Sequence, residues 1–351
     1  MQNSATARLI LENGTVFTGR PFGFVHDVLG EVVFTTNMTG YQETLTDPSF
    51  CGQIVVMTYP LIGNYGINFE DMESDKPALS AFVVREACDY PSNFRTEMSL
   101  DGFLRQNRIM GLEGIDTRAL TRIIRDCGCM RGIITTQNLD GEDLKARFDT
   151  LDNSDVISRV SAKYSYNIGG TGERVAFIDM GAKHGILRDL SALGCDITVF
   201  PYNVSAKEIE KLNPDMVFVS NGPGDPRDVP ETVETVKQLI GKYRVCGICM
   251  GHQIIGLALG CGIKKLKFGH HGGNHPVKNT ETGRVYISSQ NHNYIVSDLP
   301  GDVRELYTNV NDGTCEGIKH DGLHVCSVQF HPEASPGPLD TRFIFKSFFE
   351  I

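Results

Sequence analysis

The chain has 351 residues, of which 40% are hydrophobic and 22% are charged, and its formal net charge at pH 7 is −10. This length allows two domains of ordinary size. No apolar run approaches the ~20 residues that span a bilayer, and an acidic chain without a basic block is not typical of nucleic-acid binding. We therefore expect a globular protein that has neither a membrane nor a nucleic acid as its partner.

The cysteine content and the first residues bear on the compartment. Ten cysteines are too few for a disulfide scaffold, so reduced thiols are expected. Residues 1–5 include no basic segment followed by an apolar one, so no secretion signal is predicted. Together these features predict a cytoplasmic protein.

Residues 1–152 mix short strands with a few helices and predict a mixed α/β domain. Alternating apolar residues on both sides of Asn13-Gly14 indicate a hairpin of Arg8–Glu12 and Thr15–Thr18. The Gly-, Asn- and Thr-rich stretches 36–43 and 45–49 are interpreted as turns. Further strands are expected at Glu31–Thr36, Gln53–Tyr59 and Leu79–Arg85, and helices at Leu100–Gln106, Thr117–Cys127 and Glu142–Leu151.

Residues 153–173 are predicted to be a linker. They contain Gly169-Gly170-x-Gly172, which lacks the Gly-x-Gly-x-x-Gly spacing of a dinucleotide-binding loop and follows no strong strand. A flexible connector is the better interpretation.

From residue 174 to 351, strands and helices alternate, which predicts a doubly wound, mostly parallel sheet. Strands are expected at Val175–Ile178, Asp196–Phe200, Met216–Val219 and Arg244–Ile248, and helices at Lys183–Leu193, Ser205–Leu212 and Pro230–Lys242. After Gly262 we expect strands and loops, with a last helix at Asp340–Glu350. Such sheets bind ligands beyond the carboxyl ends of their strands.

Cys249 stands at one of these carboxyl ends, in Gly247-x-Cys249-x-Gly251. This pattern has the form of a nucleophile elbow in which Cys replaces Ser. The glycines are expected because a Cβ at either position would clash with strand or helix. The following helix N-terminus favours the thiolate, which is the reactive form.

A nucleophilic cysteine needs a base, and His331 follows the apolar strand Val325–Phe330, with Glu333 two residues later. Glu333 would fix the tautomer of His331 and leave its other nitrogen facing the sulfur. The backbone N–H of Met250 and the loop Gly222-Pro223-Gly224 would donate to a tetrahedral oxyanion. This set of groups suits attack on a carboxamide through a thioester.

Two other chemistries are compatible with parts of the sequence. Cys246-x-x-Cys249 has the spacing of a redox pair, but Cys246 falls inside an apolar strand and is predicted to be a core residue. The run His270-His271-Gly-Gly-Asn274-His275 could bind a metal. It lacks a spaced set of Cys or carboxylate ligands, so we expect a hydrogen-bonding loop and no metal.

The segments around Cys249 and His331 resemble the class I (triad) glutamine amidotransferases. Several further stretches resemble the small, glutaminase subunits of carbamoyl-phosphate synthase within that class, and the likeness covers the chain nearly end to end. These stretches are Met38–Glu43, Leu45–Ser49, Thr58–Pro60, Gly114–Arg118, Asn221–Pro226, Phe268–Pro276, Gln290–His292 and His331–Gly337.

The resemblance implies that the chain hydrolyses L-glutamine to glutamate and ammonia, with Cys249 as nucleophile, His331 as base and acid, and Glu333 as its orienter. It implies a heterodimer with a large subunit, which receives the ammonia through a tunnel and makes carbamoyl phosphate with ATP and Mg²⁺. No cofactor is expected in this chain. The implied glutamine-binding residues are Ser49, Gly222, Gly224, Met250, Gln253, Asn291, Asn293 and Tyr294.

The chain departs from the family pattern at Asn293-Tyr294, where relatives often have Gly-Phe, and at Phe330 before His331. Two alternatives stay open. One is a triad amidotransferase that feeds another synthase, and the other is a catalytically silent scaffold that regulates its partner. The sequence does not distinguish arginine from pyrimidine biosynthesis as the pathway served.

Overall fold

The computed structural model describes residues 6–351. The prediction of no secretion signal concerns residues 1–5, which lie outside the described residues. The chain divides into two compact units, Met1–Asn153 and Ser154–Ile351, which we call the N-terminal and C-terminal units. Within the described residues, no helix is both long and apolar enough to cross a membrane.

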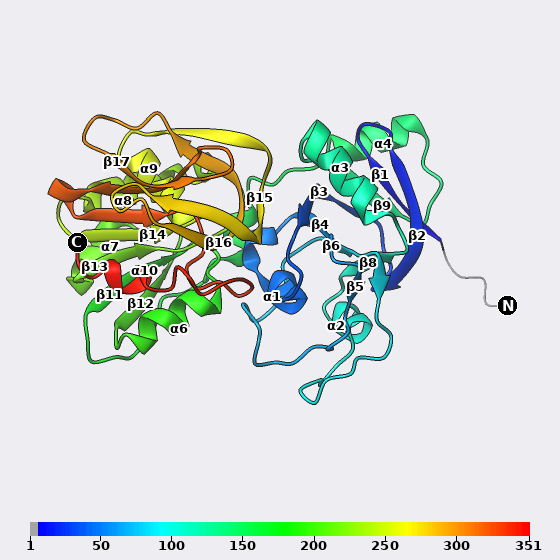
Figure 1. The fold of residues 1–351 in the computed structure, drawn as a ribbon, viewed down its shortest axis with the longest axis horizontal. Coiled ribbons are helices and arrows are strands. Elements are labelled where there is room, and N and C mark those ends of the chain that lie inside the picture. Colours follow the sequence, from blue (N-terminus) through cyan, green and yellow to red (C-terminus); the bar gives the residue numbers. More distant parts are fainter. Residues whose placement is uncertain (1–5) are drawn as a thin grey trace. The chain divides into compact units, whose positions relative to one another are not determined.

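The N-terminal unit is built on a closed barrel with the strand order β1-β2-β8-β6-β4-β3-β9 (Figure 1). Its strands are β1 (Ala7–Leu11), β2 (Val16–Gly23), β3 (Val28–Thr35), β4 (Gln53–Met57), β6 (Ala81–Val83), β8 (Met110–Glu113) and β9 (Met130–Thr135), and β5 (Leu61–Ile62) and β7 (Glu86–Ala87) form a small separate sheet. Its helices are α1 (Tyr41–Thr46), α2 (Leu100–Gln106), α3 (Thr117–Cys127) and α4 (Gly141–Phe148). The predicted hairpin is confirmed as β1–β2, and α2 and α3 have the bounds expected from the sequence.

The strand directions decide which residues of this barrel share a rim. β3, β4, β6 and β8 are neighbours and run parallel, so their carboxyl ends lie along one rim. The remaining pairings in the barrel are antiparallel.

The interpretation of residues 36–49 as turns is wrong, because they contain α1 and the 3₁₀ helix η1 (Pro48–Phe50). Tyr41 and Leu45 lie one helical turn apart and are both buried in the core of the unit. Asp47 caps η1 by accepting a hydrogen bond from the Ser49 N–H at 2.9 Å. Burial of the two apolar side chains outweighs the turn preference of their neighbours.

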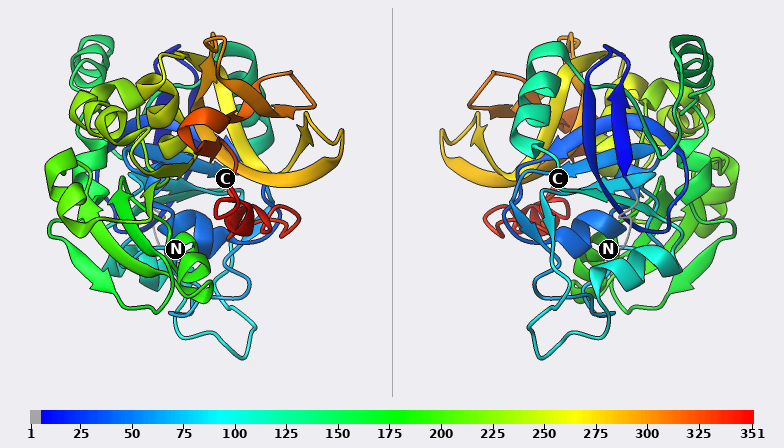
Figure 2. Two further views of the ribbon diagram at one scale, coloured as in Figure 1. Left: turned by 90° about the vertical axis from the view of Figure 1, so that its left-hand side faces the viewer. Right: turned by 90° about the vertical axis from the view of Figure 1, so that its right-hand side faces the viewer.

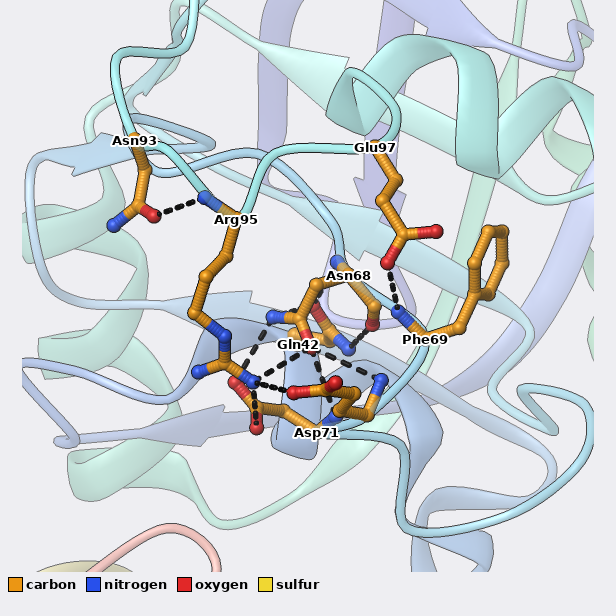
Figure 3. Close-up of polar contacts among 8 residues, drawn as sticks. Gln42, Asn68, Phe69, Asp71, Asn93, Arg95 and Glu97 are labelled. Atoms are coloured by element: carbon orange, nitrogen blue, oxygen red, sulfur yellow. Dashed lines mark hydrogen bonds and ion pairs between the residues drawn. The ribbon is translucent and has the colours of Figure 1, made fainter.

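The family-like stretch Met38–Glu43 also anchors a long loop of the N-terminal unit (Figure 3). Buried Gln42 accepts a hydrogen bond from the Asn68 N–H at 2.9 Å and donates one to the Asn68 carbonyl. Arg95 then donates to Asp71 at 2.8 Å and to Glu70 at 2.9 Å. The guanidinium of Arg95 is therefore neutralised within the unit.

The C-terminal unit holds a ten-stranded sheet with the order β10-β12-β11-β13-β14-β19-β18-β17-β15-β16. Five neighbouring strands, from β12 to β19, run parallel, and the others join antiparallel. The predicted α/β fold with a doubly wound parallel sheet is confirmed. Its strands are β10 (Tyr166–Ile168), β11 (Arg174–Asp179), β12 (Asp196–Pro201), β13 (Met216–Val219), β14 (Arg244–Ile248), β15 (Gly262–Asn279), β16 (Val285–Ser297), β17 (Arg304–Asn309), β18 (Cys315–His320) and β19 (Val325–Val328).

Helices cover both faces of the parallel strands (Figure 1). One core places side chains of α7 (Ala206–Leu212), α8 (Pro230–Leu239) and α9 (Met250–Ala258) against alternate strand residues such as Ala176 and Ile178. The other core uses α6 (His184–Ala192) and α10 (Ile344–Ser347) against Val175 and Phe177. Each strand is apolar on both sides because both of its faces are covered.

Residues 153–173 are structured, although we expected a flexible connector. They contain α5 (Val156–Val160) and β10, which pairs antiparallel with β12. Gly170 is needed there for close approach, since a Cβ would lie 2.1 Å from the Cys195 carbonyl oxygen. The glycines that suggested flexibility instead let two backbone segments touch.

The second half of the unit adds a long antiparallel hairpin, β15–β16, drawn in yellow and gold in Figure 2. Its register shifts at two places, between Lys265 and His270 and between Gly272 and His275. The last helix, α10, is shorter than the expected Asp340–Glu350. The hairpin matters for function because it carries residues 290–294.

Candidate active site

Cys249 occupies the sharp turn between β14 and α9. Its backbone has φ 55° and ψ −105°, a conformation that a residue with a side chain rarely adopts. A Cβ on Gly251 would lie 2.1 Å from the Val219 carbonyl oxygen, and one on Gly247 would lie 2.9 Å from the Gly251 carbonyl carbon. The predicted need for both glycines is confirmed, and the turn has the strained form of a nucleophile elbow.

Strand pairing brings His331 to Cys249. β19 runs parallel beside β14, and the Cys249 N–H donates to the Val328 carbonyl at 2.9 Å. Three residues later, the His331 N–H donates to the Ser289 carbonyl of β16 at 2.8 Å. The chain thus leaves β19 at the same edge of the sheet as the elbow, where both side chains are almost completely buried.

His331 and Glu333 form a close pair, with 2.6 Å between Nδ1 and Oε1. Burial alone would lower the pKa of His331, but the negative charges of Glu333 and of the Cys249 sulfur outweigh it and raise that pKa. The Nε2 atom of His331 is also buried. Among the described residues, the Cys249 side chain is the group that interacts with it. This arrangement favours an imidazolium beside the sulfur, as a thiolate nucleophile requires.

Lys183 completes the buried group of charges, and it was not predicted from the sequence. Its Nζ lies 3.1 Å from Glu333 Oε1 and also donates to the Ala334 carbonyl, and the two side chains are 2% and 0% exposed. Burial alone would raise the pKa of Glu333, but the charges of Lys183 and His331 lower it. Lys183 follows closely after the carboxyl end of β11, where parallel sheets place functional residues. This position is the feature of the sequence that could have identified Lys183 as a site residue.

The loop Asn221–Pro226 lies directly against this lysine. The Asn221 side chain accepts a hydrogen bond from the Lys183 N–H at 3.0 Å. A Cβ on Gly222 would lie 2.3 Å from the Met180 carbonyl oxygen, and Gly224 has a φ of +88°. Glycine is therefore required at both predicted glutamine-binding positions for the loop to take this course.

The predicted residues of β16 adjoin the elbow through backbone atoms. Cys249 Sγ lies 3.6 Å from the Asn291 carbonyl oxygen, and Gln253 Nε2 donates to the Tyr294 carbonyl at 2.8 Å. The side-chain oxygens of Asn291 and Asn293 both face the ring of His271, at 2.8 and 2.9 Å. The structure thus brings these residues near Cys249, with Met250 next to it in sequence.

Ser49 belongs to η1 of the N-terminal unit, and its part in binding glutamine stays a prediction. The departure at Phe330 is accommodated, since this side chain is fully buried and contacts the Tyr307 ring edge-on at 5.3 Å.

Cys246 is a buried core residue whose thiol faces the Phe348 carbonyl, and all ten cysteines are free thiols. Burial raises the pKa of the Cys246 thiol well above its usual value, as suits an inert cysteine.

Two more histidines of the site were not predicted from the sequence. His252 is fully buried on α9, where burial lowers its pKa to about 3, and its Nδ1 lies 2.9 Å from Ser327 Oγ. His292 is buried on β16, where burial and the nearby charge of His270 lower its pKa. Both are therefore neutral and act through hydrogen bonds.

The glycine-rich run on β15 gathers carboxylates as well as histidines. His270 lies between Asp312 and Glu316, at 2.8 and 3.4 Å. Burial opposes its protonation, but the two carboxylates raise the pKa of His270. Nitrogen atoms of His270 and His292 and an oxygen of Glu316 lie within 4.8 Å of one another. The expectation that this run holds no metal stays a prediction.

Comparisons with known proteins agree with this geometry. The family model described as carbamoyl-phosphate synthase small chain, CPSase domain, matches residues 9–134, and the model of class-I glutamine amidotransferases matches residues 176–351. The chain is 55% identical over 342 residues to the carbamoyl phosphate synthase small chain of Clostridium perfringens, covering 97% of this chain and 98% of that one. It is 49% identical over 349 residues to the pyrimidine-specific small chain of Bacillus subtilis, covering 98% and 95%. By these matches, and with an elbow cysteine beside a His–Glu pair, the chain belongs to the family of carbamoyl phosphate synthase small chains.

Proposed function

We propose that this chain is the glutaminase subunit of a glutamine-dependent carbamoyl-phosphate synthase. Cys249 attacks the carboxamide carbon of L-glutamine, and the tetrahedral oxyanion accepts hydrogen bonds from the Met250 N–H and the Gly222–Gly224 loop. His331 protonates the leaving ammonia, and a thioester remains on Cys249. Water, deprotonated by His331, then releases glutamate.

The observation that carries this proposal is the juxtaposition of the elbow cysteine with a buried His331–Glu333 pair. The sulfur forms the acyl bond, His331 moves the proton, and Glu333 holds the ring and stabilises its charged form. Lys183 keeps Glu333 ionised in an environment that would otherwise favour the neutral acid.

We further propose that the ammonia passes to a large synthetase subunit in a heterodimer, and that ATP and Mg²⁺ act in that subunit. The names of the relatives support this assembly, and one relative is named pyrimidine-specific. A cytoplasmic location is part of the same proposal, and it agrees with ten free thiols.

The test uses an electrophilic glutamine analogue. We expect one equivalent of label on Cys249, found by mass spectrometry of peptides, together with release of glutamate from glutamine. A protein that takes up no label would support the silent scaffold instead. A protein that is labelled but supplies no ammonia to the large synthetase subunit would support an amidotransferase serving another synthase.

A further inference from the structure

The N-terminal unit contains a pocket that the glutaminase chemistry does not use. It has a volume of about 640 Å³, and its charged lining residues are Arg85, Arg118, Arg122, Arg125 and one carboxylate, Asp116, which caps α3 by accepting from the Ala119 N–H. Two stretches on which the family resemblance rests, Thr58–Pro60 and Gly114–Arg118, contribute to this lining. We call it the arginine pocket.

The barrel topology explains why these residues meet. Thr58 follows β4, Arg85 follows β6, and Arg118 follows β8, and these three strands are parallel neighbours. Their carboxyl ends therefore lie at one rim, the edge at which parallel sheets present binding residues. The pocket is a product of the fold, because it takes residues from three successive strand ends.

Helix α3 supplies most of the charge. Arg118, Arg122 and Arg125 are spaced i, i+4 and i+7, so they form a stripe on one face of the helix. The stripe is about 10 Å long at 1.5 Å per residue. Like charges at this spacing slightly destabilise a helix, so the stripe does not serve the stability of α3.

The arginines of the pocket are available to an outside partner. Arg85, Arg118 and Arg122 are exposed, and none has a salt-bridge partner in the part of the chain that the structure describes. Only Arg125 has one, Asp126 at 3.0 Å, and that pair is exposed on both sides and so contributes little. Arg95, in contrast, has two carboxylates of its own (Figure 3).

The neighbouring surface is suited to a protein partner. Tyr59 lies between two residues of the arginine pocket and lines a second cavity of about 120 Å³ together with Met38, which is 74% exposed. Tyrosine, methionine and arginine are among the residues enriched in protein interfaces. Exposed arginines along 10 Å of helix suit several carboxylates on one segment better than a single enclosed ligand.

We propose that the arginine pocket docks an acidic segment of the large synthetase subunit. This inference rests on the proposed function, since it identifies the surface that the partner of the glutaminase would use. Bidentate pairs between guanidinium groups and Asp or Glu side chains would hold the segment.

The test is a charge reversal, Arg118→Glu together with Arg122→Glu. We expect the Kd for the purified large subunit to rise about 100-fold, because central arginines of an interface are often worth a factor of ten or more each. Labelling of Cys249 by the glutamine analogue should not change. The matched control is Lys145→Glu with Lys207→Glu, two exposed helical lysines with the same charge change, and it should bind as wild type does.

Other outcomes overturn the inference. Unchanged affinity in the double variant would do so, and so would equal weakening in the control, which would indicate a general effect of charge. Stabilisation of the free wild-type subunit by phosphate or citrate, lost in a variant that still binds the large subunit normally, would assign the pocket to a small anion.

Two measurements keep the test interpretable. Arg118→Gln with Arg122→Gln avoids new negative charge and replaces the first variant if that one does not fold. If the wild-type subunit itself neither reacts with the analogue nor supports glutamine-dependent synthesis, the proposed function fails. If wild type does both and the variant binds equally well, only the docking site fails.

Discussion

In the C-terminal unit, the charged groups at the elbow are buried and paired with one another, whereas the arginines of the N-terminal pocket are exposed and mostly lack a carboxylate. Lys183, His331 and Glu333 are each at most 4% exposed. Buried charges are tolerated only when they are paired and hydrogen-bonded, so this group is complete within the chain. An exposed arginine has no such requirement and can be left for another molecule. The buried, paired charges at the elbow thus serve the reaction, whereas the exposed arginines of the N-terminal pocket serve binding to the partner subunit.

The largest effect should come from Cys249→Ser, which tests whether the elbow alone carries hydrolysis. We expect glutamine-dependent synthesis to fall at least about 10³-fold, because a serine hydroxyl is not activated as a thiol is. Synthesis from free ammonia by the assembled complex should persist. Both rates can be measured as carbamoyl phosphate formed, and loss of both would contradict a role confined to glutamine hydrolysis.

His331→Asn should reduce glutaminase turnover by about 10²–10⁴-fold, the usual contribution of a positioned general acid–base group. The amide cannot protonate the departing ammonia. Single-turnover release of ammonia measures the step directly. Turnover near the wild-type rate would remove His331 from the mechanism.

Lys183→Met tests whether the buried charges depend on one another. It leaves Glu333 without its ammonium partner, so the pKa of Glu333 should rise and the free energy of unfolding should fall by about 3–5 kcal/mol. Urea unfolding measures the change. Adding Glu333→Gln should recover part of the loss, because the neutral amide replaces a buried carboxylate that has lost its ammonium partner. Additive losses would show that the two residues act independently.

Gly251→Ala should destabilise the protein by about 1–3 kcal/mol, as overpacking does. The new Cβ would clash with the Val219 carbonyl oxygen, a backbone atom that cannot rotate away as a side chain can. Gly141→Ala on α4 is the matched control, because no atom lies within 4 Å of its Cβ position and alanine favours a helix. Equal stability of the two variants would argue against the tight strand–helix contact.

The smallest effect concerns pH. Because Asp312 and Glu316 raise the folded-state pKa of His270, its contribution to stability is full below the unfolded pKa of about 6.5 and is lost as pH rises through the folded value. Between about pH 6 and pH 9, the free energy of unfolding should therefore fall more in wild type than in His270→Gln. His275 and His292 stay neutral, since burial lowers the pKa of both. Parallel pH profiles would refute the charged state of His270.

The sequence was most informative where local pattern and chemistry coincide. Gly247-x-Cys249-x-Gly251 predicted the elbow, and α2 and α3 have the predicted bounds. In the structure each of these helices begins with a side-chain cap, from Ser99 and Asp116. Lys183 was missed because its role depends on a contact with Glu333, 150 residues away, which no local pattern encodes.

The same limit explains the errors in the fold. Closure of the barrel depends on pairings such as β1 with β9, which lie far apart in sequence. Residues 153–173 were predicted to be a connector because glycines signal conformational freedom, whereas the structure uses Gly170 for close contact with Cys195. The arginine pocket was also not predicted, since it is assembled from three separate strand ends.

The burial of Cys249 bears on how long the subunit stays active. Oxidants damage cysteines in proportion to their exposure and thiolate character, and this side chain is only 1% exposed. Enclosure thus opposes oxidation of a sulfur that its ion pair with His331 makes susceptible, so peroxide should inactivate the protein faster whenever the site opens. An electrophile shaped like glutamine enters by specific binding and reacts quickly. The same enclosure that selects the substrate therefore also lengthens the working life of the nucleophile.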